Sequence, residues 1–428
     1  MESNFMPKNR AIFIDRDGVI CEDGYISSPE QLKLLSGAAD AIAKINKLGF
    51  LAIVITNQPV IARGECTEED VQKINQKMVE CLLKKGARID AVYYCPHHPE
   101  QRNDIPEWAQ KYRIDCDCRK PKPGLFIQAA REHNIDLTTS FMIGDSTRDI
   151  LAGKNAGCKT ILVGTGCVGK DGKFDARPDA VAEDILEAVN MISEASEMPA
   201  VILVGGRGER LRPLTDDVPK PLLPIAGKPV LEWQLELLRR HGIKRVFICG
   251  HYLLSKIQEY FGDGSRFGLE IEYIDDGSVQ LGSGGALKNL KDKINKSFIL
   301  LSGDVMTTLD ITALALTHTS SGSMATVVVR ETDHPQDSDI IQMDENGRAI
   351  KFFSKGETTK TGNLGIVGAF ALNPAIFQMI ETLPCNFEND LLAPLVNKGT
   401  DIHCYFSRDY FKDIGTPERY TKAQNRNY

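Results

Sequence analysis

Short apolar runs that end in polar residues alternate with amphipathic stretches along the first half of this chain. The runs are too short for surface helices and predict buried strands at residues 11–14, 51–55, 91–95 and 141–143. Residues 32–48 and 67–85 instead place apolar side chains at helical spacing. This alternation predicts strand-helix units that build a parallel sheet covered on both faces.

The second half repeats the pattern. Strands are expected at residues 200–204, 246–249 and 298–301, and a helix at residues 230–241. Between the halves, residues 181–192 predict one more helix, and the small polar residues 193–199 predict a linker. The expected fold class is α/β with two domains, residues 1–192 and 200–428, each a doubly wound, mostly parallel sheet.

Composition supports this picture. The length of 428 residues exceeds the size at which single cores stop growing, which favours two domains. No apolar run approaches the roughly 18 residues of a spanning helix, and residues 1–10 lack the apolar core of a signal peptide, so a cytoplasmic protein without a membrane partner is expected. Eleven scattered cysteines indicate reduced thiols and one metal site. The net charge of −7 gives no general attraction to nucleic acid. A homo-oligomer is neither indicated nor excluded.

Two acids directly follow the first strand. Asp15 and Asp17 would lie at the carboxyl edge of the sheet, where α/β proteins bind ligands. An ionised Asp15 can attack phosphorus and form an aspartyl-phosphate, while Asp17 can protonate the leaving alkoxide. Because acids repel a phosphate dianion, the site needs a divalent cation, for which we expect Mg²⁺, with Asp145 as a further ligand and Asp149 as its support. A simple Asp-Gly turn is the alternative.

Polar groups at neighbouring strand ends can serve the same site. Thr56, Asn57 and Gln58 follow the second strand, and hydroxyl and amide groups can hold phosphoryl oxygens. Arg119 and Lys120 open a helix after a long loop. The lysine would neutralise a phosphoryl group in its transition state, and the arginine would bind a second phosphate. Taken alone, each stretch is equally typical of a polar loop.

Four soft ligands stand in two pairs, Cys95 with His97 and Cys116 with Cys118. Such a set closes a tetrahedral zinc site, which would fix the loop and leave no position for a catalytic water. Four reduced side chains in a polar loop are the alternative, and His98 is the less suitable ligand.

The motifs DRDGVI, TNQ, YYCPHHP, CDCRKPKPG and GD stand in this order and resemble the haloacid dehalogenase (HAD) superfamily, most closely its D-glycero-D-manno-heptose 1,7-bisphosphate phosphatases. The resemblance implies a Rossmann-like HAD fold, with Asp15 as nucleophile and Asp17 as acid/base. It implies Mg²⁺ on Asp15, Asp145 and the Asp17 carbonyl, and stabilisation of the phosphoryl group by Thr56 and Lys120. The substrate-binding residues would be Glu22, Asp23, Gly24, Tyr25, Asn57, Gln58 and Arg119.

Two positions depart from this family's pattern. Pro59 and Ser146 replace a serine and a lysine that are common there, so the reaction is better indicated than the sugar. The histidinol-phosphate phosphatases share the site and are the alternative.

A glycine-rich turn follows the strand at residues 200–204. Gly205, Gly206 and Gly208 let the backbone approach a triphosphate, and Arg210 adds charge where the β,γ-phosphates would lie. The turn is neither a Walker loop nor a dinucleotide fingerprint. A second glycine-rich segment, residues 281–286, is expected to be a loop against which a base or sugar lies.

The motifs GGxGxRLxPLT, PKP, GD and DIGTP, in this order, resemble the sugar-1-phosphate nucleotidylyltransferases, nearest to their heptose/mannose-1-phosphate guanylyltransferase type. The resemblance implies a nucleotide-diphospho-sugar transferase fold with Mg²⁺ on Asp304 and Asp413. Arg210 and Lys220 would steady the leaving pyrophosphate. The family's E-K-P is Ser354-Lys355-Gly356 here, which puts recognition of the sugar hydroxyls in doubt. Further contacts to substrate would come from Gly284, Lys355 and Asn363.

The two resemblances together predict consecutive reactions. A phosphatase that removes the 7-phosphate of a heptose 1,7-bisphosphate leaves a heptose 1-phosphate, which a nucleotidylyltransferase can accept. We expect a bifunctional enzyme of nucleotide-activated heptose synthesis for bacterial surface polysaccharide, with GTP as donor and ATP as the alternative. Other hypotheses are a histidinol-phosphate-type phosphatase fused to a mannose/glucose-1-phosphate nucleotidylyltransferase, a non-catalytic nucleotide-sugar sensor as second domain, and two unrelated activities.

Overall fold

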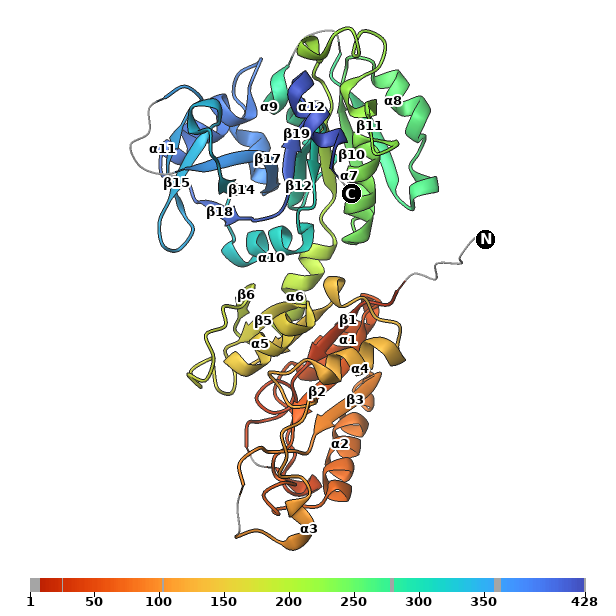
Figure 1. Ribbon diagram of the computed structural model, residues 1–428, viewed down its shortest axis with the longest axis vertical. Coiled ribbons are helices and arrows are strands. Elements are labelled where there is room, and N and C mark those ends of the chain that lie inside the picture. Colours follow the sequence, from red (N-terminus) through yellow and green to blue (C-terminus); the bar gives the residue numbers. More distant parts are fainter. Residues whose placement is uncertain (1–7, 25, 102–103, 278–280, 358–362, 427–428) are drawn as a thin grey trace. The chain divides into compact units, whose positions relative to one another are not determined.

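The uninterrupted apolar run Ala11–Ile14 forms β1, which is buried on both faces at the centre of a sheet. The sheet order is β3-β2-β1-β4-β5-β6, and every pair is parallel (Figure 1). The other strands are β2 (Leu51–Asn57), β3 (Ala91–Cys95), β4 (Phe141–Gly144), β5 (Lys159–Val163) and β6 (Ala180–Ala182). Because the order reverses between β1 and β4, their carboxyl ends flank a crevice suited to ligands.

The computed structural model describes residues 8–24, 26–101, 104–277, 281–357 and 363–426. The chain divides into two compact units, Met1–Ser193 and Glu194–Tyr428. No helix among the described residues is long and apolar enough to cross a membrane.

Helices of the first unit bury the apolar faces that their spacing predicts. In α1, the buried residues Ala38, Ala41, Ile42 and Ile45 lie one helical turn apart. In α2, Thr67 caps the helix by accepting a hydrogen bond from the Asp70 amide. The helices are α1 (Ala38–Lys47), α2 (Glu68–Leu83), α3 (Glu107–Gln110), α4 (Gly124–Glu132), α5 (Thr147–Ala156) and α6 (Ile185–Ser196).

Two predicted helices have the wrong bounds. The helix predicted over residues 32–48 begins only at Ala38, because the Leu35 amide bonds the Ile20 carbonyl (2.9 Å) and Gly37 takes a left-handed conformation before the helix. The helix predicted over residues 181–192 begins at Ile185, since Val181 lies in β6. It continues to Ser196, so residues 193–196 of the predicted linker are helical.

The second unit also has a mixed α/β fold. Its main sheet has the order β11-β10-β7-β12-β17-β14-β18. Only β17 among these strands runs antiparallel to its neighbours, which confirms the mostly parallel sheet. The strands of this path are β7 (Ala200–Leu203), β10 (Arg245–Gly250), β11 (Glu270–Asp275), β12 (Phe298–Ser302), β14 (Ala325–Glu331), β17 (Leu364–Leu372) and β18 (Ile402–Phe406).

Smaller elements complete this unit. The hairpin β15–β16 joins the main sheet through β17, while β13 pairs β19 and β8 pairs β9. Their bounds are β8 (Pro224–Ile225), β9 (Lys228–Pro229), β13 (Val305–Thr307), β15 (Ile340–Met343), β16 (Ala349–Phe353) and β19 (Phe411–Asp413). The helices are α7 (Val230–Arg240), α8 (Leu254–Phe261), α9 (Gly282–Leu287), α10 (Ile311–Ser321), α11 (Ala393–Asn397) and α12 (Pro417–Gln424).

The glycine-rich segment at residues 281–286 is not the predicted loop, because α9 begins within it. Its glycines serve close packing: an added Cβ would lie 2.3 Å from the Cys385 oxygen at Gly282 and 2.8 Å from the Cys385 sulfur at Gly284. Contact with the chain around Cys385 therefore offsets the poor helix propensity of glycine.

Substitution at Gly282 tests this packing. Gly282→Ala should destabilise the second unit by about 2–4 kcal/mol, because it combines a left-handed backbone (φ +76°) with a backbone clash. Gly399 also has a positive φ (+79°) but no neighbouring atom within 4 Å of an added Cβ, so Gly399→Ala should cost about 1–2 kcal/mol. Urea unfolding of both variants measures the difference, and equal losses would contradict the packing explanation.

Candidate active sites

Three carboxylates meet where the order of the first sheet reverses. Asp15 follows β1, Asp145 follows β4 and Asp149 lies in α5, and each offers an oxygen within 4.8 Å of the other two. Burial, with the neighbouring acids Asp149 and Asp17 in addition, raises the pKa of Asp15 to about 6 against the opposing attraction of Lys120. Burial and the Asp15 charge raise the pKa of Asp145 to about 7. Such a crowded acidic set is suited to a divalent cation.

Lys120 is the buried cation of this cluster. Its Nζ lies 3.0 Å from Asp15 Oδ1 and 2.6 Å from Asp149 Oδ1, and it donates to the Ile55 carbonyl at 2.9 Å. Burial opposes its charge, but these carboxylates raise the pKa of Lys120. Burial would raise the pKa of Asp149, and Lys120 with the Ser146 hydroxyl lowers it instead. The lysine and Asp149 are therefore held as an ion pair beside Asp15.

A cavity of about 350 Å³ opens above these groups. Asp17, Thr56 and Arg119 line it as predicted, together with Asp23 and Gly24. Glu22 is exposed and lies 3.6 Å from Lys33, and Tyr25 lies outside the described residues.

The predicted amides make internal hydrogen bonds. The Asn57 side chain makes two hydrogen bonds to the Lys120 backbone: it accepts from the amide (3.0 Å) and donates to the carbonyl (3.1 Å). Gln58 is 2% exposed and bonds Arg16, Asp17 and Thr56. Their side chains thus organise the strand end.

Sequence reasoning missed several cations around this cavity. Arg63, Arg148 and Lys173 also line it. The place of Arg148 three residues after Asp145 was a usable signal, because α5 begins at that strand end. Arg63 and Lys173 come from loops whose path the sequence does not reveal.

The four predicted soft ligands converge. Cys118 Sγ lies 3.2 Å from Cys116 Sγ, 3.3 Å from Cys95 Sγ and 3.2 Å from His97 Nδ1. One ligand atom from each of the four residues lies within 4.8 Å of the others. Three thiols and an imidazole at this spacing are the donor set of a closed zinc site.

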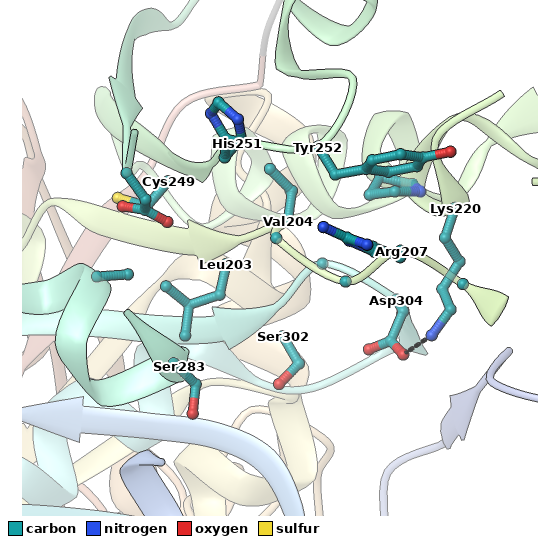
Figure 2. Close-up of a pocket in the computed structure, with 18 of the residues that line it drawn as sticks. Leu203, Val204, Arg207, Lys220, Cys249, His251, Tyr252, Ser283, Ser302 and Asp304 are labelled. Carbon is teal, nitrogen blue, oxygen red and sulfur yellow. Dashed lines mark hydrogen bonds and ion pairs between the residues drawn. The ribbon is translucent and has the colours of Figure 1, made fainter. Parts of the chain in front are cut away.

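A larger cavity, about 1110 Å³, opens at the strand ends of the second sheet. The predicted Gly205, Gly206, Gly208, Arg210, Lys220 and Asp304 all line it. Figure 2 shows Lys220 and Asp304 pointing toward each other, with Nζ to Oδ2 at 2.6 Å. Arg207, His251, Tyr252 and Glu388 also line the cavity and were not predicted.

Asp413 lies beside Asp304 through the pairing of β13 with β19. The Ile414 amide donates to the Asp304 carbonyl at 3.0 Å. Burial would raise the pKa of Asp413, but Arg419, whose Nη1 contacts both carboxylate oxygens (2.8 and 3.0 Å), lowers it. An added Cβ on Gly415 would lie 3.0 Å from Asp413 Oδ1 and 3.1 Å from Arg210 Nη2. Both predicted metal ligands thus have basic partners.

Three predicted contact residues lie elsewhere among the described residues. Gly284 is buried, and its amide donates to the Cys385 carbonyl at 2.9 Å. Lys355 is exposed, with Nζ 3.9 Å from Asp337. Asn363 accepts a backbone hydrogen bond from Thr332 at 2.8 Å. None of the three belongs to the described lining of the cavity.

Comparison with known proteins separates the same two parts. Residues 199–427 match a family model described as nucleotidyl transferase, and residues 117–188 match a HAD-hydrolase-like model. The first part is 41% identical over 186 residues to D-glycero-beta-D-manno-heptose-1,7-bisphosphate 7-phosphatase of Pasteurella multocida, covering 43% of this chain and 96% of that enzyme.

The second part also has named relatives. It is 32% identical over 244 residues to UTP–glucose-1-phosphate uridylyltransferase of Synechocystis, covering 53% of this chain and 62% of that enzyme. Among solved structures, HddC from Yersinia pseudotuberculosis matches with 28% identity and a TM-score of 0.46, covering 53% of this chain and 98% of its own.

Cation binding at the first site should depend on pH. With pKa values of about 6 for Asp15 and about 7 for Asp145, both carboxyls are largely protonated at about pH 5.5 and ionised at about pH 8. A cation must displace those protons, so Mg²⁺ should bind at least about tenfold more weakly at the lower pH. Calorimetric titration of Mg²⁺ at both pH values measures this, in an Asp304→Asn background so that the second site contributes less. Equal affinities would contradict the raised pKa values.

Proposed function

Because this chain belongs to the nucleotidyl transferase family through residues 199–427, and to the heptose-bisphosphate 7-phosphatases through its first unit, we propose that it makes a nucleotide-activated heptose in two steps. The chain is an enzyme with a phosphatase unit and a nucleotidyltransferase unit. The single observation that carries the proposal is that one chain has two cavities, one lined by Asp15, Asp145 and Lys120 and the other by Gly205, Arg210 and Asp304. The heptose 1-phosphate that the first reaction releases would then enter the second.

In the first step, Asp15 attacks the phosphorus of the 7-phosphate and Asp17 gives a proton to the departing sugar oxygen. Water then attacks the aspartyl-phosphate, with Asp17 as the base that takes its proton. Lys120 and Thr56 stabilise the phosphoryl group in transit. Mg²⁺ held by Asp15, Asp145 and the Asp17 carbonyl would neutralise the phosphate charge.

Recognition of the bisphosphate depends on the loop with the soft ligands. Arg119 directly follows Cys118, and its Nη1 donates to the His97 carbonyl at 2.9 Å. Zinc on the four soft ligands would fix this loop and so hold the arginine toward the cavity, where it binds the second phosphate of the substrate.

In the second step, an oxygen of the sugar 1-phosphate attacks the α-phosphorus of a nucleoside triphosphate, and pyrophosphate leaves. The amides of Gly205, Gly206 and Gly208, with Arg210 and Lys220, hold the triphosphate. Mg²⁺ would be held by Asp304 and Asp413 and would balance the charge of the triphosphate. Lys220 contacts Asp304, so a bound cation would have to share that carboxylate with the lysine.

We propose GTP as the donor and the cytoplasm as the location. The donor rests on the likeness of the second unit's motifs to guanylyltransferases, with ATP as the alternative. The location fits the described cysteines, all of them free thiols.

Two substitutions separate the steps. Asp15→Asn should lower phosphate release from heptose 1,7-bisphosphate at least about 10³-fold, because the nucleophile is lost, and should leave nucleotidyl transfer to heptose 1-phosphate unchanged. Asp304→Asn should lower nucleotidyl transfer and leave phosphate release unchanged. Asp292→Asn, at an exposed position, should change neither rate. Mass spectrometry of phosphate, pyrophosphate and nucleotide-sugar with each NTP measures both steps. A wild-type protein that hydrolyses no sugar phosphate, or binds nucleotide-sugar without turnover, would refute the proposal.

Zinc should be present in the purified protein at about one ion per chain. Cys118→Ser should lose it and raise KM for the bisphosphate, because Arg119 is no longer held. Cys81→Ser, at a half-buried thiol outside the cluster, should keep the zinc content and the KM of the wild type. Elemental analysis with steady-state kinetics measures them, and full activity of a zinc-free Cys118→Ser protein would contradict the role of the loop.

A further inference from the structure

Arg16, which stands between the two acids of the first motif, is a fully buried charged side chain. A buried guanidinium is costly unless it is paired and hydrogen-bonded. Its Nε donates to Asp17 Oδ1 at 2.8 Å and its Nη2 to Asp17 Oδ2 at 3.0 Å. This bidentate contact fixes the plane of the Asp17 carboxylate.

Two buried amides complete the contacts of this guanidinium. Its Nη2 also bonds Gln58 Oε1 (2.8 Å), and its Nη1 bonds Asn75 Oδ1 in α2 (2.9 Å). Because a guanidinium only donates, both amides must turn their oxygens toward Arg16. The NH₂ group of Gln58 is thereby aimed at Asp17 Oδ2 (2.8 Å) and at Thr56 Oγ1 (2.9 Å).

The two carboxylate oxygens of Asp17 accept different numbers of hydrogen bonds. Oδ2 accepts from both Arg16 and Gln58, which occupies its two lone pairs, whereas among the described residues Oδ1 accepts from Arg16 alone. Only Oδ1 keeps a lone pair for a transferable proton. Thr56 Oγ1 likewise accepts from Gln58, so its own hydrogen is free to point at a phosphoryl oxygen.

We propose that Arg16, Gln58 and Asn75 are positioning residues that select Oδ1 of Asp17 as the proton-transfer atom and orient the Thr56 hydroxyl as a donor. The proposal rests on the phosphatase function. As the bond from Asp15 to phosphorus forms and the ester P–O bond breaks, the departing alkoxide takes the proton from Oδ1. Water later returns a proton to Oδ1 while its oxygen bonds to phosphorus and frees Asp15. Gln58 thus acts through two other side chains and not on the substrate.

The basicity of the leaving group gives a specific readout. A sugar alkoxide needs the proton of Asp17, whereas the weakly basic phenolate of p-nitrophenyl phosphate does not. The ratio of kcat/KM for a sugar bisphosphate to kcat/KM for p-nitrophenyl phosphate therefore reports proton donation, and kcat/KM excludes the later hydrolysis of the aspartyl-phosphate. Asp17→Asn cannot transfer a proton to the leaving group and should lower this ratio about 10²–10⁴-fold, which is the largest effect expected.

Gln58→Leu should lower the ratio by at least about tenfold, since Asp17 loses one of the contacts that distinguish its oxygens. Asn75→Leu should lower it in the same direction, while Asn75→Asp, which still offers an oxygen to Arg16, should stay near the wild type. Gln72→Leu, the same exchange at an exposed position of α2, is the control.

The outcomes separate the two proposals. A ratio that stays constant in folded Gln58→Leu and Asn75→Leu, with both substrates slowed equally, would overturn the positioning network and leave the phosphatase function intact. Failure of the wild type to hydrolyse either substrate would overturn the phosphatase function itself. Folding is monitored by thermal unfolding, and the Asn75 pair decides the question if Gln58→Leu does not fold.

Discussion

The contact of one buried ammonium group with two carboxylates is the constraint on which the first unit's site depends. Lys120 Nζ lies within 3.0 Å of both Asp15 and Asp149. Attraction between unit charges at about 4 Å is on the order of 4 kcal/mol at an effective dielectric constant of about 20. Burial opposes the charge of Lys120, but its two carboxylate partners raise its pKa, so the lysine stays charged. No ammonium group among the described residues is in direct contact with Asp145, and burial raises its pKa to about 7, which a bound cation would relieve.

Seven of the nineteen strands formed by the described residues, and the acids at their carboxyl ends, could be predicted because they depend on local signals. An apolar run followed by an acid fixes both a strand and its carboxyl end, which is how Asp15 and Asp145 were found. The elements that were wrong depend on distant contacts. The residues before Ala38 pair with the segment after β1, and α9 exists because its glycines pack against Cys385. Neither contact leaves a trace in the local sequence.

The sequence did not reveal which side chains of the sites position or pair with other side chains. Gln58, which was expected to hold substrate, lines the cavity, and its amide is in addition engaged by Arg16, Asp17 and Thr56. Arg16 was not singled out in the sequence, and it is buried in contact with Asp17, with Gln58 after β2 and with Asn75 of α2. In the second unit, Arg419 of α12 contacts Asp413 at the end of β19, and their spacing of six residues gave no signal of this contact. Supporting residues of this kind have no motif, because tertiary packing alone selects their partners.

The division between the two units falls inside a helix. Residues 193 and 194 are consecutive positions of α6, which ends at Ser196. A truncation placed at that division would sever i to i+4 hydrogen bonds and fray both new termini. Glu197 pairs with Lys296 at 3.0 Å, so an isolated nucleotidyltransferase that starts at Glu197 would keep this ion pair, and an isolated phosphatase that ends at Ser196 would keep the whole helix. The bond between Ser196 and Glu197, directly after α6, is therefore the suitable division for studying either half alone.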